Sequence, residues 1–141
     1  MKRKYFMGMG LLVLAGLPLT AGEHKVPQAP ADYQSLKNPI EMNAGNVDRG
    51  KTLYHRKCKK CHGKDGDGHG PKSKTLDLKP MDWTKSGYLT KRSDGQLFWF
   101  TLTGGGDANS EMGAYGPGSD ENMSKEDIWK IIAYMRKDFS K

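Results

Sequence analysis

The clearest pattern of hydrophobic and polar positions lies at the end of the chain. Ser124 followed three residues later by Asp127 forms a capping box, which marks where a helix begins. After this start, apolar residues recur every three or four positions and so share one helical face: Ile128, Ile131, Ile132, Met135 and Phe139. We therefore predict an amphipathic helix that starts after Ser124 and extends to about residue 139.

The pattern predicts two more helices earlier in the chain. Asn46 can cap a helix that runs toward Cys58, because four residues fall near helical spacing: Val47, Gly50, Leu53 and Tyr54. Ser93 and Gln96 form a second capping box before residues 97–102, although the run Leu-Phe-Trp-Phe-Thr-Leu has the propensity of a strand. The cap favours a helix here.

The remaining segments predict loops. Residues 63–86 are rich in Gly, Pro and Lys and contain at most one helical turn, near residues 73–78. Residues 104–118 form a loop whose length is uncommon unless the loop is functional or disordered. Residues 23–45 hold three prolines and read as an extended arm on the surface. The pattern as a whole predicts a small all-α domain with long Gly-rich loops.

The N-terminus has the features of a secretory signal. Lys2, Arg3 and Lys4 precede an uncharged run over residues 5–19, and small residues follow at positions 20–22. This run is shorter than the ~20 apolar residues that span a bilayer, so we expect cleavage and export to the periplasm rather than an uncleaved anchor. The predicted organisation is a signal peptide at 1–22, an arm at 23–45 and one domain at 46–141.

Composition adds a constraint on the core. The chain has 141 residues, which suits one domain, and two cysteines, which excludes a disulfide-rich scaffold. Residues 1–21 contain 13 of the hydrophobic residues, which leaves 37 among the other 120, or about 31%. A small domain with so little apolar material needs an additional stabilising group, such as a cross-link, a metal or a cofactor, which we call its staple.

The two cysteines and a histidine supply a candidate for that staple. Cys58, Cys61 and His62 form a C-x-x-C-H motif, the pattern of covalent c-type haem attachment. Thiols three residues apart can reach the two vinyl groups on one edge of a porphyrin, and the adjacent imidazole of His62 can bind the iron. One haem c would also add a large apolar group to the core.

Two other interpretations of the motif have weaker support. A redox disulfide between Cys58 and Cys61 in a thioredoxin-like site would need a βαβ pattern, which the sequence lacks. A zinc site could combine the cysteines with two of His55, His62 and His69, but the spacings match no common zinc module.

With this motif in place, residues 38–136 resemble a single-haem class I cytochrome c. The matching segments are the first helix with its motif (residues 46–63), the loop at 66–71, the stretch at 112–116 and the last helix (residues 124–134). The resemblance implies three to five helices wrapped around a covalently attached haem.

The resemblance also implies roles for individual residues. Met112 would be the distal iron ligand, and the Pro71 carbonyl would accept a hydrogen bond from the His62 ring. Gly50 and Tyr54 would pack against Tyr134 where the terminal helices cross. The family usually has proline after its ligand methionine, and Gly113 departs from that pattern.

The residues alone leave the distal ligand open. Met112 lies in a Gly-rich loop before a packed helix, as a segment that crosses to the other face of a haem would. Met81, Met123 and an open iron position remain alternatives. Met135 falls on the apolar face of the last helix, which indicates a core residue.

An iron bound by histidine and methionine has no open position for substrate, so we expect no catalytic residues and a one-electron carrier between respiratory redox proteins. One alternative is a dedicated haem subunit that binds an oxidoreductase through the arm at 23–45. Another is a five-coordinate haem protein that binds a small gas or peroxide, which requires that Met112 leave the iron free.

Charge suggests the kind of partner. The net charge is +7. Residues 48–74 contain three acidic residues and nine basic ones, and the basic residues are Arg49, Lys51, Arg56, Lys57, Lys59, Lys60, Lys64, Lys72 and Lys74. Such a surface would steer an acidic redox protein, although a solvated charged face is the simpler interpretation.

Other partners are not expected. Because the basic run lacks interleaved aromatic residues, we expect no nucleic acid as a partner, and we expect no small-molecule substrate. Membrane contact without a span is compatible with the charge.

Overall fold

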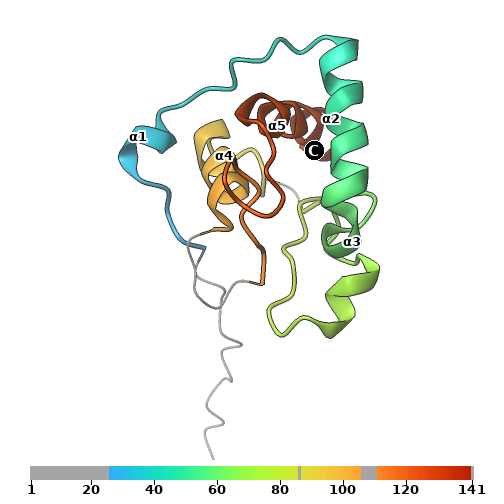
Figure 1. Ribbon diagram of the computed structural model, residues 1–141. Coiled ribbons are helices and arrows are strands. Elements are labelled where there is room, and N and C mark those ends of the chain that lie inside the picture. Colours follow the sequence, from blue (N-terminus) through green and yellow to red (C-terminus); the bar gives the residue numbers. More distant parts are fainter. Residues whose placement is uncertain (1–25, 86, 106–110, 141) are drawn as a thin grey trace, which may run out of the picture.

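The structure is a computed structural model that describes residues 26–85, 87–105 and 111–140. Within these ranges the chain forms α-helices and one 3-10 helix, η1, with no strand (Figure 1). The elements are α1 (Ala31–Gln34), α2 (Ala44–Lys57), α3 (Lys59–His62), η1 (Pro71–Thr75), α4 (Asp94–Thr103) and α5 (Lys125–Phe139). The all-α prediction is confirmed, and the strand alternative for residues 97–102 is wrong, because these residues lie in α4.

The fold is organised by the crossing of α2 and α5, the most extensive helix contact in the described chain. Gly50 permits the close approach, because a Cβ atom at this position would lie 1.9 Å from the Lys130 carbonyl oxygen. It would also lie 3.1 Å from Cβ of Tyr134. Tyr54 and Tyr134 pack with ring centroids 5.4 Å apart. The predicted crossing is therefore present, and only glycine fits at its centre.

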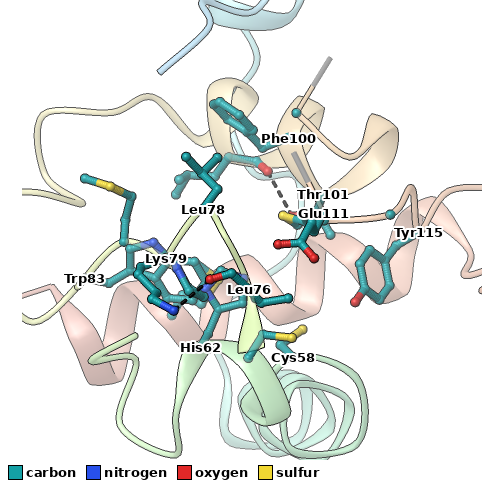
Figure 2. A pocket seen from close by; sticks show the side chains of 18 of the residues that line it. Cys58, His62, Leu76, Leu78, Lys79, Trp83, Phe100, Thr101, Glu111 and Tyr115 are labelled. Carbon is teal, nitrogen blue, oxygen red and sulfur yellow. Dashed lines mark hydrogen bonds between the residues drawn. The ribbon is translucent and has the colours of Figure 1, made fainter. Parts of the chain in front are cut away.

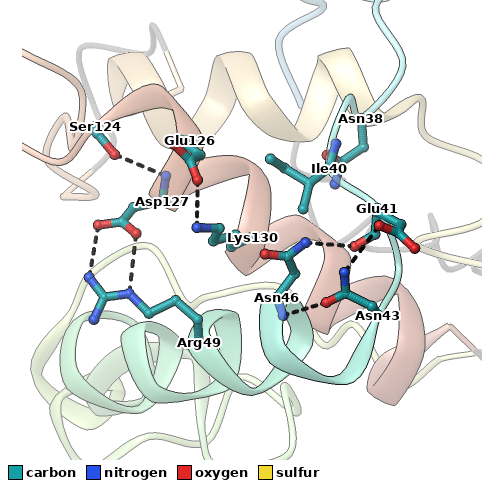
Figure 3. Close-up of polar contacts among 10 residues, drawn as sticks. All are labelled: Asn38, Ile40, Glu41, Asn43, Asn46, Arg49, Ser124, Glu126, Asp127 and Lys130. Carbon is teal, nitrogen blue, oxygen red and sulfur yellow. Dashed lines mark hydrogen bonds and ion pairs between the residues drawn. The ribbon is translucent and has the colours of Figure 1, made fainter.

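The first helix begins earlier than predicted. Its cap is Asn43 rather than Asn46, because the Asn43 backbone is extended and its side-chain oxygen accepts a hydrogen bond of 3.0 Å from the Asn46 backbone N–H. Asn46 lies in the first turn and donates through its side chain to the Glu41 carbonyl oxygen (Figure 3). Two asparagines three residues apart give the same signal in the sequence, and the structure selects the earlier one.

Each of the other two predicted capping boxes forms only one of its two expected hydrogen bonds. The hydroxyls of Ser93 and Ser124 each accept a 3.0 Å hydrogen bond from the backbone N–H three residues later. The side chains at these third positions do not return to the cap. Asp127 instead accepts two hydrogen bonds from Arg49 on α2 (Figure 3), and Gln96 binds the N-terminal arm. The capping residues therefore also join distant segments.

The arm is fastened to the domain over its described part. The side chain of Gln96, which is buried, accepts from the Ala29 N–H at 2.8 Å and donates to the Pro27 carbonyl at 3.0 Å. Asn38 donates to the Trp129 carbonyl at 2.8 Å. At Gly95 of α4, a Cβ atom would lie 1.6 Å from the Tyr33 carbonyl oxygen. The described part of the arm thus contacts the domain, and it contains the short helix α1, which lies beside α4.

The predicted signal peptide at 1–22 lies outside the described residues. Among the described helices, none is long and apolar enough to cross a bilayer.

Candidate functional site

The C-x-x-C-H residues are held at the end of α2. Cys58 ends this helix, and its carbonyl oxygen accepts hydrogen bonds from the backbone N–H groups of Cys61 (3.1 Å) and His62 (3.0 Å). The Tyr54 hydroxyl donates to the Gly63 carbonyl at 2.7 Å. Burial raises the pKa of Tyr54 far above its usual range, so the hydroxyl keeps its proton for this bond. These hydrogen bonds hold the backbone of the motif in a defined conformation.

A cavity of about 390 Å³ opens beside the motif. Cys58, Cys61 and His62 line it together with Met112, so the structure brings the four predicted site residues to one place. Figure 2 shows Cys58 and His62 on one side, and Phe100 and Thr101 of α4 on the opposite side. Most of the remaining wall is apolar and includes Leu76, Leu78, Tyr88, Leu97, Tyr115, Ile131 and Met135.

His62 presents the form that binds a metal. Burial lowers its pKa to about 4, so the imidazole is neutral near pH 7, as metal ligation requires. Its Nδ1 atom is buried and has no hydrogen-bond partner in the described structure. The predicted bond to the Pro71 carbonyl is therefore wrong for this structure. Pro71 instead begins η1, where its ring suits the first helical position.

The cysteines are free thiols. Burial raises the pKa of Cys58 to about 12, which keeps the sulfur protonated near pH 7. Free thiols are the groups that form thioethers with haem vinyls, whereas a redox-active cysteine pair needs a thiol of lowered pKa, which the burial of Cys58 disfavours. The zinc alternative also lacks support, because the described residues contain no group of three or more His, Cys, Asp and Glu residues that could hold a metal ion.

The candidate methionines occupy different places. Met81 and Met112 both line the cavity, whereas Met123 is buried in the hydrophobic core. Met135 is also buried there, as predicted, although it reaches the cavity wall. Met42 is exposed. Two methionines are therefore placed as alternatives for the distal position.

Met112 and Met81 enter the cavity from different segments. After Met112 the chain pairs with the end of α4, where Tyr115 N–H donates to the Thr101 carbonyl at 3.1 Å. A Cβ atom on Gly104 would lie 2.5 Å from the Met112 carbonyl, so this segment packs closely against the end of α4. Met81 lies two residues before Trp83, whose ring stacks on His62 with centroids 4.2 Å apart.

Charged side chains also line the cavity, and they include two carboxylates, Glu111 and Glu121, as well as four cationic groups. Lys79 and Arg92 line it, as do Lys60 and Lys72. Lys79 donates to three backbone carbonyls of residues 73–76, which closes the loop after η1. The Arg92 guanidinium lies 3.6 Å above the Tyr88 ring and donates a 2.8 Å hydrogen bond to the Tyr88 carbonyl. Sequence reasoning did not single out either residue, because nothing distinguishes them among 23 Lys and Arg residues.

The cytochrome c family profile matches residues 47–138. This chain therefore belongs to the cytochrome c family, as a class I c-type cytochrome with covalently bound haem c. Membership of this family supports a role in electron transfer. The cavity fits this assignment, because it joins two free thiols, a neutral imidazole, apolar walls and cationic side chains.

Solved structures support the fold. A chain of the reducing HAO-like protein complex Kustc0457/Kustc0458 from Kuenenia stuttgartiensis matches with a TM-score of 0.60 and 22% identity, over 84% of this chain and 53% of that one. The c-type cytochrome KustC0563 matches with a TM-score of 0.51 and 23% identity, over 65% of this chain and 98% of that one. This chain spans about half the length of the first of these proteins. The comparison with curated proteins gave no match.

Proposed function

We propose that this chain is an exported single-haem electron carrier in which Cys58 and Cys61 form the thioethers and His62 and Met112 bind the iron. The observation that carries the proposal is that all four residues line one cavity with largely apolar walls. Bound haem supplies an iron that takes and gives one electron. The chain contributes two attachment points, an uncharged nitrogen ligand and a soft thioether ligand, which raises the reduction potential relative to two nitrogen ligands.

The preference for Met112 over Met81 rests on the segments that carry them. The segment after Met112 is bonded to α4, which forms the wall opposite His62. Met81 belongs to the segment that packs beside His62 through Trp83. A sixth ligand must approach the iron from the side opposite His62, so Met112 is the better placed of the two.

The proposal includes a basic docking surface for redox proteins that carry acidic patches. Of the nine basic residues between 48 and 74, Arg49 pairs with Asp127 and Lys57 with Glu121. The other seven form no ion pair within the described chain: Lys51, Arg56, Lys59, Lys60, Lys64, Lys72 and Lys74. Lys60 and Lys72 also line the haem cavity. Unpaired positive charge beside the cofactor favours encounter with an anionic partner.

This docking surface can be tested with small redox reagents of opposite charge. We expect oxidation by the anionic hexacyanoferrate(III) to slow severalfold when Lys59, Lys60 and Lys64 are replaced by Glu, and to slow with added salt. A cationic cobalt complex should respond in the opposite direction. Lys125→Glu with Lys137→Glu on α5 is the control. Equal rates in both variants would contradict the docking surface.

The structure of the arm bears on the alternative of a dedicated haem subunit. The arm contacts its own domain through Gln96, Gly95 and Trp129, so its described part is already engaged. This favours a shuttling carrier over a subunit that docks through the arm. Export through cleavage after about residue 22 remains part of the proposal, and the mass of the mature protein would test it.

The central experiment is the absorption spectrum of the protein produced with haem-maturation machinery. The reduced protein should show the sharp α band of a low-spin haem, and carbon monoxide should leave this band unchanged. A shift with carbon monoxide would indicate an open iron position, as in a gas-binding or peroxide-reactive protein. Absence of covalently retained haem would contradict the whole proposal.

A further inference from the structure

The ring of His62 is stacked on a tryptophan from a distant part of the chain. The ring centroids of His62 and Trp83 lie 4.2 Å apart and the ring planes differ by 18°, so the two rings are nearly face to face. Figure 2 shows both residues on the same wall of the cavity. Twenty-one positions separate them in the sequence, and the motif contains nothing that requires this neighbour.

Trp83 is itself firmly held. Its backbone N–H donates a 2.8 Å hydrogen bond to the Gly66 carbonyl in the loop after the motif. The same two segments touch at Gly68, where a Cβ atom would lie 2.5 Å from the Pro80 carbonyl oxygen. The Trp83 ring also packs against Tyr54 and Phe139, with centroids 6.3 Å apart in each case. The tryptophan is therefore a fixed surface against which another ring can rest.

Within the described residues, in contrast, no hydrogen bond to Nδ1 fixes the rotation of the His62 ring. Histidine ligands of metals usually donate their second ring nitrogen to a carboxylate, a carbonyl or a water, and this bond sets the orientation of the ring. In this protein Nδ1 is buried without a partner among the described residues. The hydrogen bond to the Cys58 carbonyl comes from the backbone of His62 and leaves the side chain free to turn.

We propose that Trp83 is a positioning residue for His62, which orients the imidazole by ring stacking and keeps water away from Nδ1. The inference rests on the proposed role of His62 as an iron ligand. Loss of the indole would let the imidazole turn and would admit water to accept a hydrogen bond from Nδ1. That bond makes the imidazole a stronger donor, and water raises the local polarity. Both effects favour the ferric state, so the reduction potential would fall.

The test uses the haem-loaded protein and four variants of it. Trp83→Leu removes the flat ring, and Trp83→Phe retains one. Trp99→Leu is the matched control, because Trp99 lies on α4, contacts Phe100 with centroids 5.4 Å apart and does not line the cavity. The fourth variant, Trp83→Tyr, retains a ring that can also form hydrogen bonds. The measurements are the reduction potential and the electron paramagnetic resonance spectrum of the ferric protein, whose g-values respond to the orientation of the axial imidazole.

We expect Trp83→Leu to lower the potential and to shift or broaden the g-values. Trp83→Phe and Trp83→Tyr should remain close to the original protein, and Trp99→Leu should match it. The proposal is overturned if Trp83→Leu leaves both measurements unchanged. It is also overturned if Trp83→Phe produces the same shift as Trp83→Leu, because the flat ring would then not be the relevant feature.

A measurement on the unmodified protein covers the case in which Trp83→Leu fails to fold. In the reduced, diamagnetic state, nuclear Overhauser effects between the ring protons of Trp83 and His62 are expected at the observed stacking distance, and their absence would overturn the proposal. Failure of the ligand assignment would be distinguishable from either result. In that case the unmodified protein itself would lack a low-spin ferric spectrum, before any variant is compared.

Discussion

The two sides of the haem cavity are built in different ways. On the proximal side, comprising α2, α3 and the loop to Thr75, the turn that carries the motif is held by contacts between residues close in sequence, such as Gly68 N–H to the His62 carbonyl at 2.9 Å. The distal side, comprising α4 and residues 111–123, is held by contacts across the chain, such as Gly116 N–H to the Leu102 carbonyl at 3.1 Å. A short motif can therefore define the turn that carries the two cysteines and His62, whereas the distal side depends on the completed fold.

The largest predicted effect comes from removing the attachment points on the proximal side. Cys58→Ser together with Cys61→Ser should abolish covalent haem and unfold the domain. Without haem, a cavity of about 390 Å³ with largely apolar walls would lose the packing of the cofactor, and a loss of a few kcal/mol is large against the ~5–15 kcal/mol total stability of a small domain. Haem staining after denaturing electrophoresis and circular dichroism would test this. A folded double variant would show that haem is not the staple.

The next prediction compares one glycine from each side. Gly50→Ala places a methyl group 1.9 Å from the Lys130 carbonyl, so the helices must separate at a cost of about 3 kcal/mol. Gly113 lines the cavity, and a Cβ atom there would meet no protein atom within 4 Å, so Gly113→Ala should cost about 1 kcal/mol or less. Denaturant unfolding of the haem-loaded protein measures both. Equal losses would contradict the contrast between the close helix crossing at Gly50 and the open space around Gly113.

A smaller effect is expected where the arm meets α4, on the distal side. Gln96→Ala removes both hydrogen bonds to the arm and leaves the buried Ala29 N–H without a partner, at a cost of about 2 kcal/mol. Hydrogen exchange at Ala29 should accelerate accordingly. Gln28→Ala is the control, because Gln28 is exposed one residue away. Exchange that is equally fast in both variants would show that Gln96 does not fasten the arm.

The same division explains which features the sequence could predict. The spacing of Cys58, Cys61 and His62 indicated their chemistry, and the three long helices followed from apolar periodicity and capping residues. The stacking of Trp83 on His62 and the role of Gln96 in holding the arm were not predictable, because both depend on residues brought together only by folding. The cap at Asn43 was missed because Asn46 gives the same local signal.

The distal ligand is the point at which the account can be tested most directly. Met112→Ala and Met81→Ala should each be prepared with covalent haem, and carbon monoxide binding to the reduced iron should be measured together with the ferric methionine-to-iron charge-transfer band. The account predicts that Met112→Ala binds carbon monoxide readily and loses the band, whereas Met81→Ala behaves like the unmodified protein. Carbon monoxide binding confined to Met81→Ala, or present already in the unmodified protein, would contradict histidine and Met112 as the axial pair.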